Sequence, residues 1–476
     1  MRLEQDSLGS KNVPDQAFYG VHTQRAIENF PITGERVNPE FIRSFLEIKQ
    51  AAANVNAAAG DLPSSVSKSI VSATKDLLGQ PFINDLMWPL DPIQGGAGTS
   101  LNMNVNEVIA NYALTEMKQP RGKYDLINPN DHVNLGQSTN DAYPTAGKIA
   151  VIRLLKPMMQ ELQDLIDAMG HQSDLNAKVY KMGRTQLQDA VPMTLGNNFH
   201  AWLKPLIRDL ERIKQAEEPL HTVNLGGSAI GSGINVSYHY QAHIVPKLSE
   251  ITGIELYQAH DLFDATQNLD PLVALSGALK TLALNLSKIA NDLRLLSSGP
   301  RSGLSEIHLP AKQAGSSIMP GKVNPVIPEV VNQVAFEVLG NDATISAAAG
   351  AGQLELNAFE PVLFYRLFAS IEHLTGAMQT FRVNAIDGIL PNTERLAQDI
   401  DLSASFATAM AKIVGYKKAA KLAKESLRTD QPLREIAMDS GLFTDEQLEH
   451  VFAVEEIVIN ARTPEHGLVL RPVGEK

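Results

Sequence analysis

The sequence predicts a mainly α-helical protein whose centre is an elongated bundle of long helices, with smaller helical domains before and after it. Three observations predict this class. Leucine and isoleucine recur at spacings of three and four residues over long stretches, the alternation typical of strands is confined to short pieces, and only a few stretches rich in Gly, Ser, Thr and Asn interrupt the pattern. Because this spacing lines apolar side chains along one face of each helix, such helices pack as a near-parallel bundle.

The clearest predicted helix spans residues 270–296. Eight apolar residues keep spacings of three or four through it, Asp270 and Pro271 suit the cap and the first helical position, and "SSGP" at 297–300 ends it. From Pro271, the first helical position, to Leu296, its length is about 37 Å at 1.5 Å per residue. The same spacing predicts further helices over residues 199–213 and 330–338, and a further apolar stretch over 149–169 predicts another.

Two changes in composition predict domain boundaries. Polar sequence at 128–141 ("NPNDHVNLGQSTND") and at 387–396 ("DGILPNTERL") interrupts the helical spacing of apolar residues. We therefore predict an N-terminal domain over residues 1–138, the central helical bundle domain over 139–392 and a small C-terminal helical domain over 393–476.

Composition excludes several classes of protein. Of the 476 residues, 44% are hydrophobic and 20% are charged, which is ordinary for a soluble globular protein. The chain has no cysteine, which excludes disulfides, thiolate nucleophiles, iron–sulfur clusters and cysteine-ligated zinc. A net charge of −12 disfavours nucleic acid and anionic lipid, and neither a membrane-length apolar run nor a secretory signal is visible. We expect a cytoplasmic protein that binds no nucleic acid and no membrane.

Four polar, glycine-containing stretches are candidates for the functional site: residues 95–104, 136–141, 183–189 and 315–325. At least three of them precede predicted helices. Free backbone N–H groups and the helix dipole at such ends favour anions, and the neighbouring hydroxyls and amides add donors. Ser, Thr and Asn before a helix are also ordinary caps, but four such clusters exceed what capping requires. Together they predict a site for carboxylates.

The start positions of two of these helices can be predicted from proline. After residues 138–140, Pro144 suits the first helical position, and either Pro325 or Pro328 suits the start of the helix that carries Val330.

Nucleotide and metal sites are not indicated. Gly315 and Gly321 bracket five residues and Lys322 precedes a valine, so the 315–325 loop lacks the pattern of a phosphate-binding loop. No histidine pair has zinc-ligand spacing with a carboxylate, and His132 stands alone in a polar turn. We expect no cofactor and no metal, although Lys322 could alternatively form a Schiff base with pyridoxal phosphate.

These stretches together resemble the aspartase/fumarase superfamily. "GSSIMPGKVNP" at 315–325 resembles its signature loop, and "GTSLNMNVNEVIAN", "NPNDHVN", "STNDAYPTA", "KMGRTQLQDAVPMTLG" and "LLSSGPRSGLSEI" are similar to its other segments, in the expected order. The match runs from about Gly20 to Gly340, and residues 405–427 resemble the small terminal helical domain. The resemblance implies a homotetramer whose active sites are each assembled from three subunits, and a reaction that releases fumarate.

The resemblance also implies roles for individual residues. Ser316 would be the general base, ionised by Lys322 and the loop N–H groups. Removing a weakly acidic proton beside a carboxylate yields an enediolate, whose charge must be met by preorganised hydrogen-bond donors. The positions that match the superfamily's substrate-binding residues are Thr99, Ser138, Thr139, Asn140, Thr185, Ser317, Lys322 and Asn324.

Gln186 indicates the leaving group, because fumarases resemble one another in having histidine there. Expelling hydroxide needs a general acid, which Gln cannot supply, whereas a protonated amine leaves as neutral ammonia. The sequence therefore favours reversible deamination of L-aspartate to fumarate and ammonia by a dicarboxylate-binding carbon–nitrogen lyase. Hydration of fumarate and a non-catalytic helical oligomer are the alternatives. Arg25 matches an aspartase segment, and Glu329 lies where fumarases pair a glutamate with their histidine.

Overall fold

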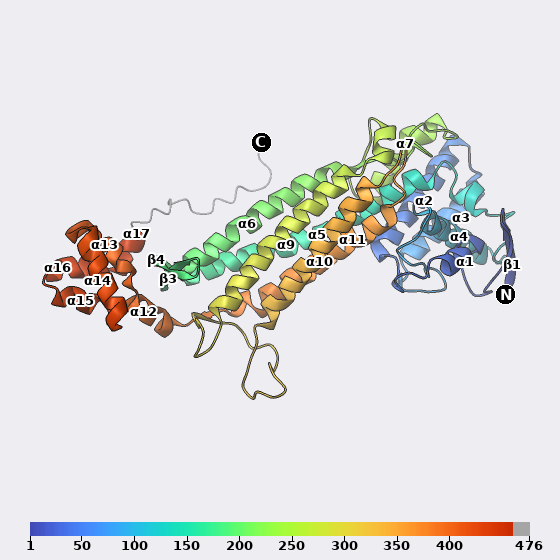
Figure 1. Ribbon diagram of the computed structural model, residues 1–476. Helices are drawn as coiled ribbons and strands as arrows, with labels where there is room; N and C mark the ends of the chain where they lie inside the picture. Colours follow the sequence, from blue (N-terminus) through green and yellow to red (C-terminus); the bar gives the residue numbers. More distant parts are fainter. Residues whose placement is uncertain (460–476) are drawn as a thin grey trace. The chain divides into compact units, whose positions relative to one another are not determined.

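The structure is a computed structural model that describes residues 1–459, and helices account for most of it (Figure 1). The predicted mainly α-helical class is confirmed. The chain forms two compact units: unit 1 consists of Met1–Gln163, Leu206–Ser287 and Val330–Gln379, and unit 2 of Asp164–Pro205, Lys288–Glu329 and the described part of Thr380–Lys476. The predicted domain boundaries, after residues 138 and 392, stay predictions.

Five long helices contribute residues to both units: α5 (Thr139–Leu175), α6 (Leu195–Glu217), α9 (Asp270–Leu296), α10 (Val326–Gly350) and α11 (Glu360–Asn384). All eight apolar residues that predicted the helix over 270–296 are buried in α9, which begins at Asp270 and ends before the predicted "SSGP". In unit 1, polar contacts supplement this apolar packing, since Ser276 donates to Asp342 of α10 at 2.8 Å.

Helix α9 is also the one described helix that is long and apolar enough to cross a membrane. Other parts of the chain bury 56% of its most apolar 18-residue window. A core helix of a bundle has the same composition, so this helix alone does not indicate a membrane protein.

The N-terminal part of unit 1 combines one hairpin with four helices: β1 (Arg2–Asp6), β2 (Gly9–Val13), α1 (Val21–Asn29), α2 (Pro39–Ala59), α3 (Ser64–Leu78) and α4 (Thr99–Glu116). A single π-turn, Pro129–Val133, follows, and His132 accepts a hydrogen bond from the backbone N–H of Asn128 within it. The remaining elements of unit 1 are β5 (Thr222–Val223), α7 (Tyr238–Thr252), β6 (Tyr257–Gln258) and α8 (Leu262–Gln267).

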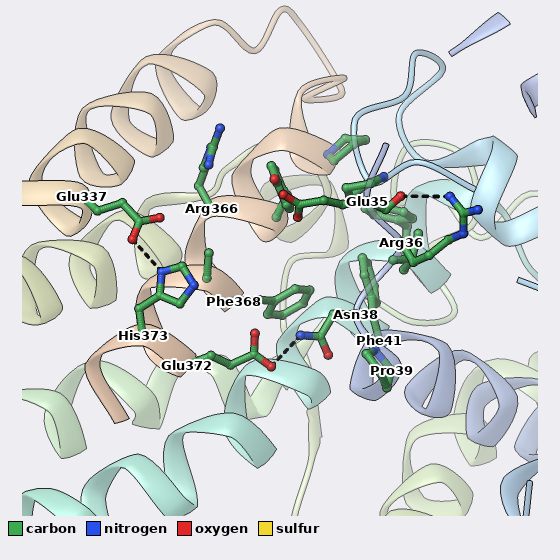
Figure 2. Close-up of a pocket in the computed structure, with 16 residues that line it drawn as sticks. Glu35, Arg36, Asn38, Pro39, Phe41, Glu337, Arg366, Phe368, Glu372 and His373 are labelled. Atoms are coloured by element: carbon green, nitrogen blue, oxygen red, sulfur yellow. Dashed lines mark hydrogen bonds and ion pairs between the residues drawn. The ribbon is translucent and has the colours of Figure 1, made fainter. Parts of the chain in front are cut away.

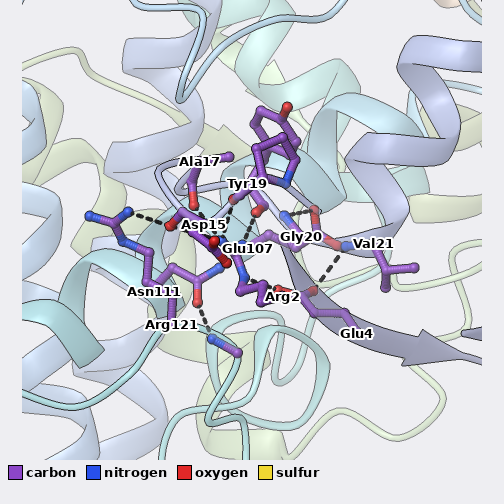
Figure 3. A network of polar contacts seen from close by, with 12 residues as sticks. Arg2, Glu4, Asp15, Ala17, Tyr19, Gly20, Val21, Glu107, Asn111 and Arg121 are labelled. Atoms are coloured by element: carbon purple, nitrogen blue, oxygen red, sulfur yellow. Dashed lines mark hydrogen bonds and ion pairs between the residues drawn. The ribbon is translucent and has the colours of Figure 1, made fainter. Parts of the chain in front are cut away.

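A buried carboxylate of α4 holds the start of α1 (Figure 3). Helix α1 has no side-chain cap of its own after Gly20. Instead, Glu107 accepts hydrogen bonds from the N–H groups of Gly20, His22 and Thr23 at 2.8, 2.9 and 3.2 Å. Because an anion at a helix N-terminus satisfies free donors and opposes the helix dipole, Glu107 fixes α1 against α4.

Unit 2 contains two short antiparallel sheets and the C-terminal helices. The hairpin is β3 (Tyr180–Thr185) with β4 (Gln188–Thr194), and β7 (Ile307–His308) pairs with β8 (Leu390–Pro391). Met182 of the hairpin packs into one core with the last helices, including Phe406, Met410 and Leu433. Those helices are α12 (Thr393–Leu402), α13 (Ala407–Val414), α14 (Tyr416–Thr429), α15 (Leu433–Asp439), α16 (Asp445–Phe452) and α17 (Val454–Ile459).

The predicted position of Pro144 is wrong, whereas α10 starts at Val326, next to Pro325 as expected. Helix α5 begins at Thr139, so Pro144 lies inside it. Proline has no N–H for the carbonyl four residues earlier, that of Asn140. That carbonyl instead accepts a hydrogen bond from Nδ2 of Asn224 at 3.0 Å, which lets the helix start early.

Candidate active site

The predicted site residues fall into two groups, one in each unit. Thr99 and Ser138–Asn140 belong to unit 1, at the starts of α4 and α5. Unit 2 holds Thr185 in the β3–β4 hairpin and the 315–325 loop with Ser316, Ser317, Lys322 and Asn324. No hydrogen bond or ion pair in the described chain links Thr185 to that loop.

Thr99 is the first residue of α4, and its hydroxyl is not used as a cap. The N-cap is Gly98, in the left-handed conformation at φ 87°. A Cβ at Gly98 would lie 2.1 Å from Cδ2 of Tyr143 in α5. Glycine therefore lets the starts of α4 and α5 approach closely, which brings Thr99 beside the segment that begins with Ser138.

A buried polar chain lies beneath Thr139. Nζ of Lys49, on α2, donates to Oδ1 of Asn102 at 2.7 Å and to Oδ1 of Asn134 at 2.9 Å. Asn102 in turn donates from Nδ2 to the hydroxyl of Thr139 at 3.0 Å. Since this hydroxyl already accepts a hydrogen bond, its own hydrogen is free to donate to an anion.

Asp141 organises the turn from Ser138 to Asn140. Its carboxylate accepts from the N–H groups of Ser138 at 2.9 Å and, across the unit, of Gly226 and Ser228 at 3.1 and 3.0 Å. Asn140 donates from Nδ2 to the carbonyl of Ala229 at 2.7 Å. The amide oxygen of Asn140 stays available as an acceptor, which suits a protonated amine.

Burial controls the pKa values in this cluster. It lowers the pKa of Lys49 to about 7, and the carboxylate of Asp141 opposes this shift. Burial also raises the pKa of Asp141 to about 6, opposed by its backbone hydrogen bonds. Both groups are therefore mainly charged only between about pH 6 and pH 7, and the polarity of the cluster changes close to neutral pH.

An open cavity next to Thr99 also contains Arg25 and His22 of α1. Arg25 forms two hydrogen bonds to Asp6, at 2.7 and 2.9 Å, and a third to the carbonyl of Gly9. The pairing with Asp6 fixes the guanidinium and compensates its charge. The structure thus places Arg25 close to a predicted site residue without leaving it as a free cation.

Thr185 lies at the end of β3, next to the hairpin turn. The turn residues Gln186 and Leu187 both have positive φ, 53° and 64°, which is the geometry of a tight two-residue β-hairpin. Leu187 is exposed. The turn therefore projects Thr185 and Gln186 from the edge of the hairpin rather than into the core.

The 315–325 loop is closed by its own hydrogen bonds. The Gly315 N–H donates to the Lys322 carbonyl at 2.9 Å, and Nδ2 of Asn324 donates to the Gly315 carbonyl at 2.8 Å. A Cβ at Gly315 would lie 2.3 Å from the Lys322 carbonyl oxygen, so glycine is required there. The Ser316 hydroxyl oxygen accepts from the N–H groups of Ile318 and Met319 at 3.2 and 3.0 Å, which stabilises negative charge on it.

Two other predicted site residues of the 315–325 loop face solvent. Ser317 and Lys322 are both exposed, and Lys322 has no charged partner in the described part of the chain. Its ammonium group is therefore available to a bound anion.

Comparisons with known proteins show the family to which this chain belongs. The family model described as Lyase matches residues 9–340, and that described as Fumarase C C-terminus matches residues 406–458. An aspartate ammonia-lyase of Bacillus sp is 48% identical over 95% of this chain and 96% of its own length, and that of Escherichia coli (strain K12) is 45% identical over 96% of both chains. The chain belongs to the aspartase/fumarase superfamily.

Solved structures of the superfamily have the same fold. A Brucella melitensis fumarate lyase:delta crystallin bound to cobalt is 46% identical, with a TM-score of 0.92 over 96% of this chain and 99% of that one. A class II fumarase from Schistosoma mansoni is 33% identical, with a TM-score of 0.92 over 97% and 100% of the two chains. The motif match from about Gly20 to Gly340 and the resemblance of the C-terminal helices are therefore confirmed.

A separate cavity of unit 1 contains none of the predicted superfamily site residues (Figure 2). Its polar groups largely satisfy one another: His373 pairs with Glu337 at 2.6 Å, and Asn38 donates to Glu372 at 2.9 Å. Within residues 1–459, no group of three or more His, Asp or Glu side chains is arranged to hold a metal ion. The candidate site therefore remains the one built from the superfamily segments.

Sequence reasoning missed the residues beneath the site. Asn102 and Asn134 stand inside segments quoted for the superfamily resemblance, but nothing in their spacing reveals that they share Lys49. Lys49 itself leaves one signal: it is, with Glu47 and Gln50, one of three polar residues among the apolar residues of "FLEIKQAAA". A charged residue in such a run is expected to be buried only if it has partners.

Proposed function

We propose that this protein is an aspartate ammonia-lyase, which converts L-aspartate reversibly to fumarate and ammonia without a cofactor. The observation that carries the proposal is the set of relatives named aspartate ammonia-lyase, 45–48% identical over 94–96% of this chain. The class II fumarase structure is 33% identical. Gln186, where fumarases resemble one another in having histidine, points in the same direction.

In the proposed reaction, Ser316 removes a proton from the carbon next to the β-carboxylate of aspartate. The electron pair of the broken C–H bond moves into that carboxylate and forms an enediolate. The pair then returns to form the C=C bond as the C–N bond breaks, and the protonated amine leaves as neutral ammonia. The two N–H groups on Ser316 Oγ support the ionised serine that this step needs, and we expect the free ammonium of Lys322, on the same loop, to add to their effect.

The unit 1 residues supply donors for the developing charge. The hydroxyl of Thr139 is oriented by Asn102, and the hydroxyl of Ser138 accepts from the Asn140 N–H at 3.2 Å, so both have a hydrogen to donate. A hydrogen bond to a charged group contributes roughly 1.5–3 kcal/mol, so several such groups together can stabilise an enediolate substantially. The amide oxygen of Asn140 suits the substrate ammonium group, which a fumarase substrate lacks.

We further propose that the active protein is a cytoplasmic homotetramer whose sites are shared between subunits, with Thr99, Thr185, Ser317 and Asn324 in substrate contact. Exposed apolar groups support assembly: Ile318 in the signature loop is 83% exposed and Phe336 on α10 is 66% exposed. Large apolar side chains exposed to this extent are typical of surfaces that another chain covers.

A paired turnover assay tests the proposal. The purified protein is incubated with fumarate plus ammonium and, separately, with fumarate alone. We expect aspartate in the first reaction and no loss of fumarate in the second. Malate as the only product would instead establish a fumarate hydratase. No turnover of either kind, combined with no rise in melting temperature on adding dicarboxylates, would indicate a non-catalytic oligomer.

A further inference from the structure

Unit 2 contains a buried cluster of charges that the proposed reaction does not use. The carboxylate of Glu306, which is fully buried, contacts Nη1 of Arg184 with one oxygen and Nζ of Lys181, at 2.5 Å, with the other. The Lys181 side chain is only 4% exposed. Arg184 also donates from Nη2 to Asp399 of α12 at 3.4 Å. The cluster joins hairpin strand β3 to the residue just before β7 and to α12.

The main chain of Glu306 is fixed as firmly as its carboxylate. Its N–H donates to the carbonyl of Leu296, at the end of α9, and its carbonyl accepts from the N–H of Asn392, both at 2.9 Å. Glu306 is therefore a rigid point to which two cations of β3 are attached. Removing one partner from a buried ion pair is costly because the other charge remains buried and uncompensated.

The turn after β3 has few other anchors. Gln186 and Leu187 are both exposed, and the β3–β4 register is irregular between Met182 and Arg184. Such an irregularity changes the direction of the side chains that follow it. The orientation of Thr185 thus depends on where its neighbour Arg184 is held.

We propose that Glu306 is a positioning residue of the active site. Through Arg184 and Lys181 it fixes the β3–β4 turn, so that Thr185 meets the substrate in one orientation. Glu306 is fully buried and acts only through this turn. The inference rests on the proposed function for one point, the contact between Thr185 and the dicarboxylate.

A double-mutant cycle on the full-length protein tests the inference. We expect Glu306→Gln and Thr185→Ala each to lower kcat/KM for aspartate by about tenfold or more. If Glu306 acts through Thr185, the double variant is no worse than Thr185→Ala within about threefold, because coupled residues give non-additive losses. Losses that multiply in the double variant would overturn the inference.

A milder variant covers the case in which Glu306→Gln does not fold. Asp399→Asn weakens the 3.4 Å contact to Arg184 together with the 3.0 Å ion pair that Asp399 forms with Arg395 of the same helix. We expect a two- to fourfold loss of kcat/KM that disappears in the Thr185→Ala background. An equal loss in both backgrounds would contradict the proposal.

The matched control is Asp209→Asn, which alters another fully buried carboxylate, held by Arg212 and by Asn285 at 2.7 Å in unit 1. We expect a lower melting temperature with unchanged kcat/KM. A fall in kcat/KM equal to that of Glu306→Gln would show that lost stability alone explains the result. If the wild type does not turn over aspartate, the proposed function fails instead, and the same cycle is measured on the dissociation constant for fumarate.

Discussion

The two groups of candidate site residues are held in opposite ways. In unit 1, the residues at the start of α5 sit on a buried network of Lys49, Asn102 and Asp141, so their donors are fixed before any ligand arrives. In unit 2, residues 317–323 are exposed, and hydrogen bonds within the loop itself give it its shape. The difference fits a division of tasks in the proposed reaction. Several residues proposed to bind the carboxylates are fixed by helices, whereas the serine proposed to remove the proton is on a segment with few anchors, as is typical of loops that close over a substrate.

The strongest test of this division is Ser316→Ala. We expect kcat to fall roughly a thousandfold, because general-base catalysis typically contributes between about a hundred and ten thousand. The melting temperature should stay the same, since the hydroxyl bonds only to exposed loop N–H groups. Turnover is measured as fumarate released from aspartate. A variant that keeps more than a tenth of the wild-type kcat would show that another group removes the proton.

Asn102→Ala tests the opposite region and should affect activity and stability together. It removes the donor to the buried Thr139 hydroxyl and one of the two acceptors of Lys49, which keeps Asn134. A buried polar group that loses its partner costs about 1–3 kcal/mol. We expect kcat/KM to fall about thirtyfold and the melting temperature to decrease. Both are measured on one preparation.

Asn104→Ala is the matched control for that variant. Asn104 is also buried on α4, but its amide donates to the carbonyl of Met87 at 2.8 Å. It should lower the melting temperature and leave kcat/KM unchanged. The comparison between the regions would break down if the two asparagine variants reduced activity equally.

A smaller effect is expected from Gly315→Ala, which tests whether the loop shape matters by itself. The added methyl group would lie 2.3 Å from the Lys322 carbonyl oxygen, so the loop must open. We expect kcat/KM to fall about tenfold at an unchanged melting temperature. Gly321→Ala is the comparison variant: φ is +82° there but the space is open, so the loss should be smaller. Equal losses would mean that the contact with the Lys322 carbonyl at Gly315 has no more effect than backbone strain at Gly321.

The smallest effect on activity, and the most specific one on stability, concerns pH. The pKa of Lys49 is about 7 in the folded protein and about 10.5 in the unfolded chain. Between these values the unfolded state binds a proton that the folded state does not, so stability rises with pH.

Relative to Lys49→Met, the wild type should therefore gain about 2 kcal/mol between pH 7.5 and 9.5. Melting temperatures of both proteins across this interval measure the gain. Parallel profiles would show that the Lys49 ammonium is not destabilised by burial.

Most of the fold was predictable because the spacing of apolar residues that indicates a helix is a local feature of the sequence. The spacing of leucines in α9 fixes both its helical state and its buried face within one stretch of sequence. The error at Pro144 has a non-local cause. The partner that satisfies the Asn140 carbonyl is Asn224, more than 80 residues away, and no local pattern could indicate it.

The site was predictable to a different degree in its two regions. Hydroxyl residues such as Ser138 and Ser316 stand out because they lie in polar stretches that interrupt the apolar helical pattern. The signature loop, residues 315–325, can be recognised because it is one contiguous segment. Lys49 and Glu306 do not stand out, since their meaning lies in contacts between segments that are far apart in sequence. Their roles can be recognised only from the contacts in the folded structure.

One atom that Gly98 lacks has a consequence for redesign. Its missing methyl group sets how near the starts of α4 and α5 can come, because the ring of Tyr143 occupies the volume that a methyl would need. The distance between the two helix starts is thus set by a missing side chain rather than by the residues expected to touch the ligand. A side chain at this position, as in Gly98→Ala, would therefore force the two helix starts apart and displace Thr99 without altering any residue expected to touch the ligand.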